Sequence, residues 1–307
     1  MRFIMNGISN KIASVQRALA GLDVTAEVPL AALTSFRIGG PAALVARPRS
    51  EAELCAALRA AEAAALPARI LGNGTNVLAP DEGFAGLIVR LDAPFSPLRI
   101  VGQRVLCSAG DSLSSVSRRS VAAGLSGMEG LEGIPGTVGG ACAMNAGAFG
   151  AEIRQILRRV RLLRGGELSD VTVQDGDLGH RRSVFAAPNA VVTGAEFELL
   201  PDDGHAAERT ADFARRRKEK QPLSLPSAGS VFKRPAGHFA GGLIEQCGLK
   251  GLRIGGAEVS TLHAGFIVNR GGASCADVVA LIEEIQRRVL LETGVRLERE
   301  LKFWNEV

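Results

Sequence analysis

The chain has 307 residues, of which 46% are hydrophobic and 22% are charged, as in ordinary globular domains. This length predicts two or three compact units. The net charge of +4 is modest, aromatic residues make up only 4% of the chain, and tyrosine is absent. A nucleic-acid binder usually adds aromatic rings on which bases stack, so this class is disfavoured, and the scattered Arg and Lys suit small anions better.

The cysteines and the N-terminus indicate a cytoplasmic protein. The five cysteines are widely spaced and form no CxxC motif, which favours free thiols in a reducing compartment. No histidines stand at metal-ligand spacing, so we expect no metal site. The N-terminus lacks the pattern of a signal peptide, and no apolar run is long enough to span a bilayer. We therefore expect no membrane insertion, and the sequence indicates no obligate protein partner.

Helices and strands alternate along the chain, which is typical of an α/β or α+β fold. Ser50 and Glu53 form a capping-box pattern before an alanine-rich helix that Pro67 ends. Asp111 is predicted to cap a second helix, and Gly294 to end a third. In chain order we predict a helix over 9–22, an extended segment over 34–48, a helix over 50–67, strands over 68–78 and 86–91, a helix over 112–125, strands over 158–163 and 190–200, a helix over 242–252, a strand over 265–270, a helix over 277–294 and a strand over 296–304.

A change of composition marks a predicted domain boundary near residue 200. The segment 201–229 begins with charged residues and ends rich in Pro, Ser and Gly. We predict one region over 1–200, with subdomains of about 1–92 and 93–200, and a second domain over 201–307.

Two glycine loops are the strongest functional signals. The first is Gly-Asn-Gly-Thr-Asn at 72–76, and the second is GIPGTVGGACAMNAGAFG at 133–150. Consecutive backbone N–H groups in such turns can bind an anion, and glycine lets a ligand approach the main chain closely. Neither loop is a Walker A or a dinucleotide fingerprint. The first loop is equally compatible with an ordinary turn, whereas the second favours ligand binding.

Several motifs, in this order, resemble the UDP-N-acetylenolpyruvoylglucosamine reductase (MurB) family. They are TSFRIGGPA, LGNGTNVLAPDEGFAGLIVRL, GIPGTVGGACAMNAGAFGAEI, SAGSVFK and GLKGLRIGGAEVSTLHAGFIVN. The resemblance covers about 30–300 and is closest to the shorter branch, which lacks an extra tyrosine-bearing loop. It implies an α+β fold: a two-part FAD-binding region of the vanillyl-alcohol-oxidase (PCMH) type, followed by a smaller α+β substrate-binding domain.

The resemblance implies that the two glycine loops hold noncovalent FAD. All four histidines follow the glycine loops, so none stands where related oxidases attach FAD covalently. The cofactor-binding residues carried over from the family are Gly72, Asn73, Gly74, Thr75, Asn76, Gly136, Thr137, Gly139, Gly140, Asn145 and Ala146.

The family reaction reduces the enolpyruvyl C=C of UDP-N-acetylglucosamine enolpyruvate to UDP-N-acetylmuramate, with NADPH as the reductant, during peptidoglycan precursor synthesis. Side chains cannot donate a hydride, so the protein must add an acid and groups that stabilise the developing carbanion. By resemblance, Ser230 is the proton donor, and Arg181 and Glu300 stabilise the enolate and polarise the substrate carboxylate.

Two lysines and two departures complete the comparison with the family. Lys220 matches a position where the family carries a lysine toward the UDP diphosphate, although it also fits a solvated basic run. Lys233 is a further candidate for contact with a phosphate or the nicotinamide. His180 replaces the family's tyrosine before the arginine, and Arg234 replaces an asparagine that often follows the Ser-x-Phe-Lys pattern.

Two other functions remain open. One is an oxidase of the same flavin fold, which would need a base and access for oxygen. The other is an FAD-binding protein without catalysis, for which His180 is the main support.

Overall fold

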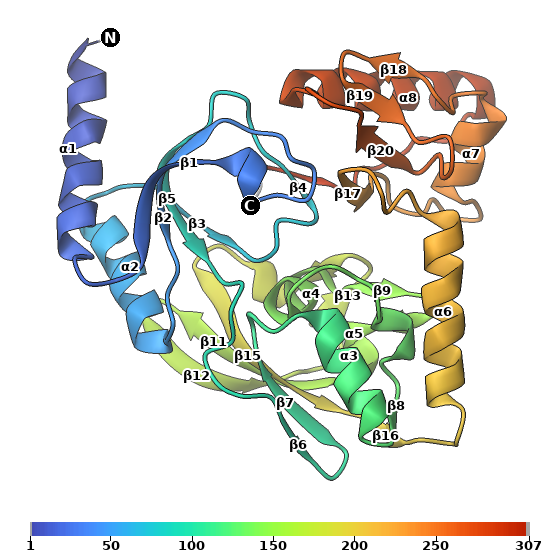
Figure 1. The fold of residues 1–307 in the computed structure, drawn as a ribbon, viewed down its shortest axis with the longest axis horizontal. Helices are drawn as coiled ribbons and strands as arrows, with labels where there is room; N and C mark the ends of the chain where they lie inside the picture. The colour runs from blue at the N-terminus through green and yellow to red at the C-terminus, as the bar shows by residue number, and fades with distance from the viewer. Residues whose placement is uncertain (1, 305–307) are drawn as a thin grey trace. The chain divides into compact units, whose positions relative to one another are not determined.

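The structure, a computed structural model, describes residues 2–304. The chain divides into two units, and each of them draws on several segments (Figure 1). The first unit consists of Met1–Thr25, Leu44–Asn73 and Gly86–Arg217, and the second of Ala26–Ala43, Gly74–Ala85 and Lys218–Val307. The division passes through the first glycine loop, between Asn73 and Gly74.

A five-stranded sheet of order β12-β11-β15-β7-β6 forms the centre of the first unit. Each pair of neighbours in it is antiparallel. The apolar residues of β7, β11 and β15 form one buried core with the helices α3 and α4. The strands are β6 (Arg99–Val101), β7 (Arg104–Ser108), β11 (Leu157–Arg164), β12 (Glu167–Thr172) and β15 (Ala190–Glu198). The helices of this unit are α1 (Arg2–Ala18), α2 (Glu51–Ala63), α3 (Leu113–Ala122), α4 (Val138–Met144) and α5 (Ile153–Ile156). Helix α6 (Ala206–Lys220) belongs to this unit up to Arg217, and its last three residues belong to the second unit.

A four-stranded sheet of order β17-β20-β19-β18 forms the centre of the second unit. Helix α8 contributes five fully or almost fully buried apolar residues to the core of this unit, at the spacing of one helix face. The elements are β17 (Ser227–Ser230), α7 (Ala240–Gln246), β18 (Arg253–Ile254), β19 (Ala257–Val259), β20 (Phe266–Asn269), α8 (Cys275–Thr293) and β21 (Lys302–Phe303), with β4 (Val77–Leu78) parallel to β21.

The remaining elements are a four-stranded sheet of order β1-β2-β5-β3, three two-stranded pairs and three short 3-10 turns. They are β1 (Val24–Pro29), β2 (Pro41–Ala46), β3 (Ala68–Leu71), β5 (Phe84–Arg90), β8 (Leu125–Ser126), β9 (Gly147–Ala148), β10 (Ala151–Glu152), β13 (Leu178–Gly179), β14 (Arg182–Ser183), β16 (Leu200–Pro201), η1 (Leu30–Ala32), η2 (Glu129–Leu131) and η3 (Val184–Ala186).

The predicted elements that rest on strong local signals are confirmed. Ser50 caps α2 through a bond from the Glu53 N–H to its hydroxyl, at 3.2 Å. The Glu53 carboxylate accepts from the N–H of Arg49 instead of Ser50, so only half of the capping box forms. Gly294 ends α8 in the left-handed conformation, at φ 71°. The strands predicted over 86–91, 158–163, 190–200 and 265–270 are also present, and the segment 68–78 forms β3 and β4 on either side of the glycine turn.

Other predictions were wrong. The cap of α3 is Ser112, because the Asp111 carboxylate accepts from the Ser108 N–H and closes the preceding turn. The first helix spans Arg2–Ala18 and not 9–22, because the chain turns at Gly21 with φ 99°. Likewise α7 ends at Gln246, before Gly248 with φ 66°. Of the strand predicted over 296–304, only β21 and an isolated bridge at Arg299 form.

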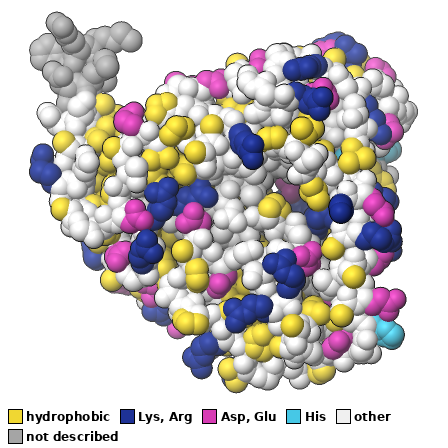
Figure 2. Space-filling view, viewed as in Figure 1, with side chains coloured by type: hydrophobic (Ala, Val, Ile, Leu, Met, Phe, Trp, Pro, Cys, Tyr) yellow, Lys and Arg dark blue, Asp and Glu magenta, His cyan; other side chains and the backbone are white. Residues whose placement is uncertain are grey.

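The surface mixes charges of both signs. Figure 2 shows Lys and Arg side chains interspersed with Asp and Glu over the visible face, in keeping with the modest net charge. Within 2–304, none of the helices has the length and apolar character that crossing a bilayer requires.

Candidate active site

The start of the first glycine loop meets the second loop within the first unit, and 62 positions separate the contacting residues Asn73 and Pro135. The Asn73 side chain donates a hydrogen bond to the Pro135 carbonyl at 2.8 Å. A Cβ atom on Gly72 would run into the hydroxyl of Thr137. Glycine at position 72 is therefore required because the second loop lies directly against it.

The second glycine loop continues into the short helix α4. Thr137 caps this helix by accepting from the Gly140 N–H at 3.3 Å. The N–H of Gly139 donates to the Ala109 carbonyl at 2.9 Å, and a Cβ at this position would lie 2.9 Å from that of Ala109. A Cβ on Gly140 would meet only the Thr137 hydroxyl, at 3.5 Å. Gly139 thus serves packing, whereas Gly140 faces open space.

Asn145 stabilises the loop from within. It is fully buried in the left-handed conformation, at φ 44°. Its amide nitrogen donates to Glu152 (3.2 Å) and to the Gly179 carbonyl (2.8 Å), and its amide oxygen accepts from the Arg154 N–H (2.9 Å). The protein itself therefore occupies the hydrogen-bonding groups of this side chain.

Arg181 is tied to the same loop. It lies in the turn between β13 and β14 at φ 53°, and its guanidinium donates to the carbonyls of Asn145 (3.2 Å) and Gly147 (3.0 Å). Its neighbour His180 is half-exposed, with Nδ1 4.0 Å from a carboxylate oxygen of Glu152. The strained turn therefore directs Arg181 towards the glycine loop.

The structure brings Ser230 and Glu300 together in the second unit, although seventy residues separate them. The N–H of Glu300 donates to the Val231 carbonyl at 2.8 Å, and an antiparallel bridge joins Phe232 to Arg299. Ser230 ends β17, and no residue in the described range hydrogen-bonds its hydroxyl. Main-chain bonds thus hold the two predicted catalytic residues on adjacent segments.

His263 lies beside Ser230, and the sequence did not single it out for catalysis. A Cβ on Gly265 would be 2.9 Å from the His263 ring and 3.4 Å from the Ser230 hydroxyl. His263 Nδ1 accepts from the Gly265 N–H at 3.0 Å, and the Gly265 carbonyl accepts from the N–H of Val231 at 2.9 Å. Burial lowers the pKa of His263 below its usual 6.5, so the ring is neutral with its proton on Nε2. The motif STLHAGFIVN was the only signal for it.

The rest of the first glycine loop belongs to the second unit. Gly74 has φ 62°, and a Cβ there would run into the Leu33 carbonyl oxygen. The Asn76 side chain donates to the Glu300 carbonyl at 3.3 Å. Asn76, which was predicted to bind the cofactor, therefore fixes the segment that carries Glu300. Thr75, between Gly74 and Asn76 in the chain, is half-buried.

Arg217 is a second residue that the sequence missed. It is only 8% exposed, and its Nε and Nη2 atoms have no hydrogen-bond partner within 2–304. Its guanidinium carbon lies 5.3 Å from the centre of the Phe149 ring, and a Cβ on Gly133 would lie 2.8 Å from Nε. Burial lowers its pKa, which the charge of Glu132 partly offsets. Two buried guanidinium nitrogens without an acceptor are unused donors that suit an anionic ligand beside the second glycine loop.

The two predicted lysines differ in their surroundings. Lys220 is exposed at the last residue of α6. The Lys233 ammonium pairs with Glu298 at 3.3 Å, and its N–H donates to the Glu298 carbonyl at 2.8 Å. Lys233 therefore also secures the C-terminal segment.

Comparisons with known proteins agree with this arrangement. A model of an FAD-binding domain matches residues 41–169, and a model of the C-terminal domain of UDP-N-acetylenolpyruvoylglucosamine reductase matches residues 221–304. The protein of that name from Alkaliphilus oremlandii is 41% identical over 285 residues, 92% of this chain and 94% of the relative. Its counterpart from Agathobacter rectalis is 40% identical over 96% of this chain and 98% of its own length.

A solved structure is similar over nearly the whole length. The crystal structure of UDP-N-acetylenolpyruvylglucosamine reductase (MurB) from Thermus caldophilus superposes with a TM-score of 0.77 at 34% identity, and the match covers 92% of this chain and 98% of that one. The α+β fold with an FAD-binding region and a C-terminal domain is confirmed. The chain belongs to the UDP-N-acetylenolpyruvoylglucosamine reductase family.

Proposed function

We propose that this chain is an FAD-containing oxidoreductase that reduces the enolpyruvyl C=C of UDP-N-acetylglucosamine enolpyruvate to UDP-N-acetylmuramate, with NADPH as the reductant. Membership of the family and the match to an FAD-binding domain support the activity. The observation that carries the proposal is the Ser230 hydroxyl, which has no partner among residues 2–304 and stands beside the segment of Glu300.

The residues of the first unit fit a phosphorylated cofactor. Gly72 and Gly139 leave no room for a side chain, and Gly140 is exposed with almost no neighbour, so a diphosphate can approach the main chain at Gly140. Arg217, with two buried nitrogen atoms that lack acceptors, supplies a positive charge next to this surface. We assign the FAD site to these loops. We also propose that residues 1–200 serve to bind the cofactor and that residues 201–307 serve to bind the substrate.

The chemistry that bound FAD supplies is hydride transfer from NADPH to the methylene carbon of the enol ether. The chain must deliver a proton to the adjacent carbon, and Ser230 is the donor in this proposal. Its O–H bond breaks as the new C–H bond forms, and the alkoxide that remains regains a proton from solvent. The neutral His263 fixes the turn that positions Ser230 and adds no second positive charge.

Arg181 and Glu300 have complementary roles. A guanidinium attracts the substrate carboxylate and the negative charge that develops on it. Glu300 polarises the same group. Lys220, exposed at the end of α6, is free to contact the substrate diphosphate. The ammonium of Lys233 already pairs with Glu298, so we propose that Lys233 contacts the substrate diphosphate more weakly than Lys220 does.

The cysteines support a cytoplasmic location for this reaction. All five are free thiols, three of them buried. Free thiols persist in a reducing compartment.

The test is the visible absorption of the purified protein, followed without oxygen. We expect NADPH to bleach the flavin bands and the enolpyruvyl sugar nucleotide to restore them. Bleaching without restoration would exclude this substrate, and restoration by oxygen alone would point to an oxidase. Absence of flavin bands even after incubation with FAD would overturn the cofactor assignment.

A further inference from the structure

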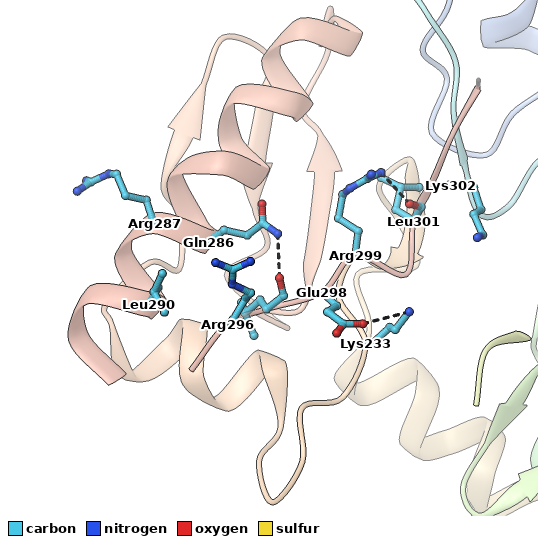
Figure 3. A pocket seen from close by; sticks show the side chains of 10 residues that line it. Lys233, Gln286, Arg287, Leu290, Arg296, Glu298, Arg299, Leu301 and Lys302 are labelled. Carbon is cyan, nitrogen blue, oxygen red and sulfur yellow. Dashed lines mark hydrogen bonds and ion pairs between the residues drawn. The ribbon is translucent and has the colours of Figure 1, made fainter. Parts of the chain in front are cut away.

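The second unit contains a cavity of about 640 Å³ between the end of α8 and the C-terminal segment. This volume is within the range of sites for small organic ligands. Figure 3 shows the side chains that line it, from Arg287 at the left of the view to Lys302 at the right. The lining residues are Lys233, Gln286, Arg287, Leu290, Arg296, Leu297, Glu298, Arg299, Leu301 and Lys302.

The cavity wall is strongly basic. Five of its ten residues are Lys or Arg, and Glu298 is the one acid among them. Glu298 pairs with Lys233, and Arg287 pairs with Glu284 on its own helix at 2.8 Å. Within the described part of the chain, Arg296 and Lys302 form no ion pair. An anion would therefore find uncompensated positive charge in this cavity.

The wall is held in place without a ligand. The Gln286 amide donates to the Leu297 carbonyl at 2.8 Å and joins α8 to the C-terminal segment. Leu297 and Leu301 of that segment are buried, whereas Leu290 is 42% exposed at the cavity. A preformed wall lowers the entropic cost of binding, and Leu290 offers an apolar surface beside the charges.

We propose that this cavity is a second anion site, which binds a linear phosphoanhydride chain such as that of a nucleoside triphosphate or of inorganic polyphosphate. With five cations and one acid, the wall carries more positive charge than a single phosphate balances, so several linked phosphates suit it better than one. The residues on both sides of Glu300 line the cavity, but Glu300 itself does not. The site is therefore distinct from the proposed catalytic pair, although it shares Lys233 with the proposed substrate contacts, and its ligand would contact the segment that holds Glu300.

The test is isothermal titration of the FAD-loaded protein with sodium tripolyphosphate and, separately, with ATP, both without divalent cations. In the double variant Arg296→Ala/Lys302→Ala we expect the dissociation constant to rise by about tenfold for each cation removed. In Glu298→Gln we expect tighter binding, because the one acid is gone. Arg253→Ala removes an exposed arginine outside the cavity and is expected to bind as the unchanged protein does.

The two ligands distinguish the source of the phosphate chain. Equal affinities would assign the site to the phosphates alone, whereas tighter binding of ATP would add a nucleoside contact at Leu290. Equal binding by the double variant and the unchanged protein, or no binding of either probe, would overturn the proposal. Flavin absorption and its bleaching by NADPH stay unchanged in the double variant if the site is distinct from the catalytic one.

Discussion

The glycine loops and the segments that carry Ser230 and Glu300 are built in different ways. The glycine loops present main chain, and their packing excludes side chains at Gly72, Gly74 and Gly139. In the second unit, side chains act, and main-chain bonds from Val231 place them. A site made from backbone tolerates almost no added atoms, whereas a site made from side chains tolerates changes that keep the hydrogen bonds. The predictions below test this difference.

The largest effect on stability is expected at Gly74. Alanine there must adopt φ 62° and place its Cβ against the Leu33 carbonyl, so Gly74→Ala should lower the free energy of unfolding by about 3 kcal/mol or more. The control is Gly102→Ala, which has φ 60° but nothing within 4 Å of its Cβ and should cost only about 1–2 kcal/mol. Denaturant unfolding measures both. Equal losses would show that close packing is unimportant at this loop.

Arg217 is expected to change stability and ligand affinity in opposite directions. Without ligand, Arg217→Met should leave the free energy of unfolding unchanged or raise it, because it removes a buried charge that lacks acceptors. With ligand, the dissociation constant for FAD should rise by about tenfold or more. Arg216→Met, which alters a half-exposed arginine paired with Asp212, should bind FAD normally. Weaker binding of the sugar nucleotide alone would move Arg217 to the substrate site.

His263 is expected to matter for one half-reaction. In His263→Ala the turn that holds Gly265 loses its acceptor, so flavin reoxidation by the substrate should slow by about tenfold, while reduction by NADPH stays unchanged. Asparagine can accept the same N–H, so His263→Asn should recover most of the rate. Stopped-flow absorption separates the two steps. Equal slowing of both would contradict a positioning role next to Ser230.

The smallest expected effect is the pH dependence of stability. Burial lowers the pKa of His263 in the folded state, so the unfolded chain binds more protons below the usual pKa of 6.5. The free energy of unfolding should therefore fall as the pH drops from about 8 to about 5, and part of this fall should vanish in His263→Asn. Unfolding of both proteins across this range measures the difference. A larger fall in the variant would reverse the assigned direction.

The sequence predicts best what local signals determine. Ser50 before α2 and Gly294 after α8 have side chains or backbone freedom that act within one helical turn, and both predictions are confirmed. The helix α4 within the second glycine loop was not predicted, since glycine disfavours helices, whereas the Thr137 cap and the core packing of Val138, Ala141 and Cys142 stabilise it. Asp111 and Ser112 compete for one cap, and the choice depends on the Ser108 turn.

The sequence predicted only those residues of the candidate site that belong to recognisable motifs. Ser230 and Glu300 were chosen by resemblance, and their proximity depends on pairing across seventy residues. Arg217 looked like one charge in the run RRRKEK, because burial and missing acceptors are properties of the folded chain. The sequence also did not predict that each unit consists of three separate segments of the chain, because that division depends on long-range contacts.

The most direct measurement of the central claim compares both half-reactions in Ser230→Ala and in Ser224→Ala, an exposed serine of the same segment. We predict that Ser230→Ala retains FAD and its reduction by NADPH, while reoxidation by the enolpyruvyl sugar nucleotide slows by about 10²–10⁴-fold. Ser224→Ala should behave as the unchanged protein does. Reoxidation of Ser230→Ala at the unchanged rate would contradict the role of this hydroxyl as the proton donor.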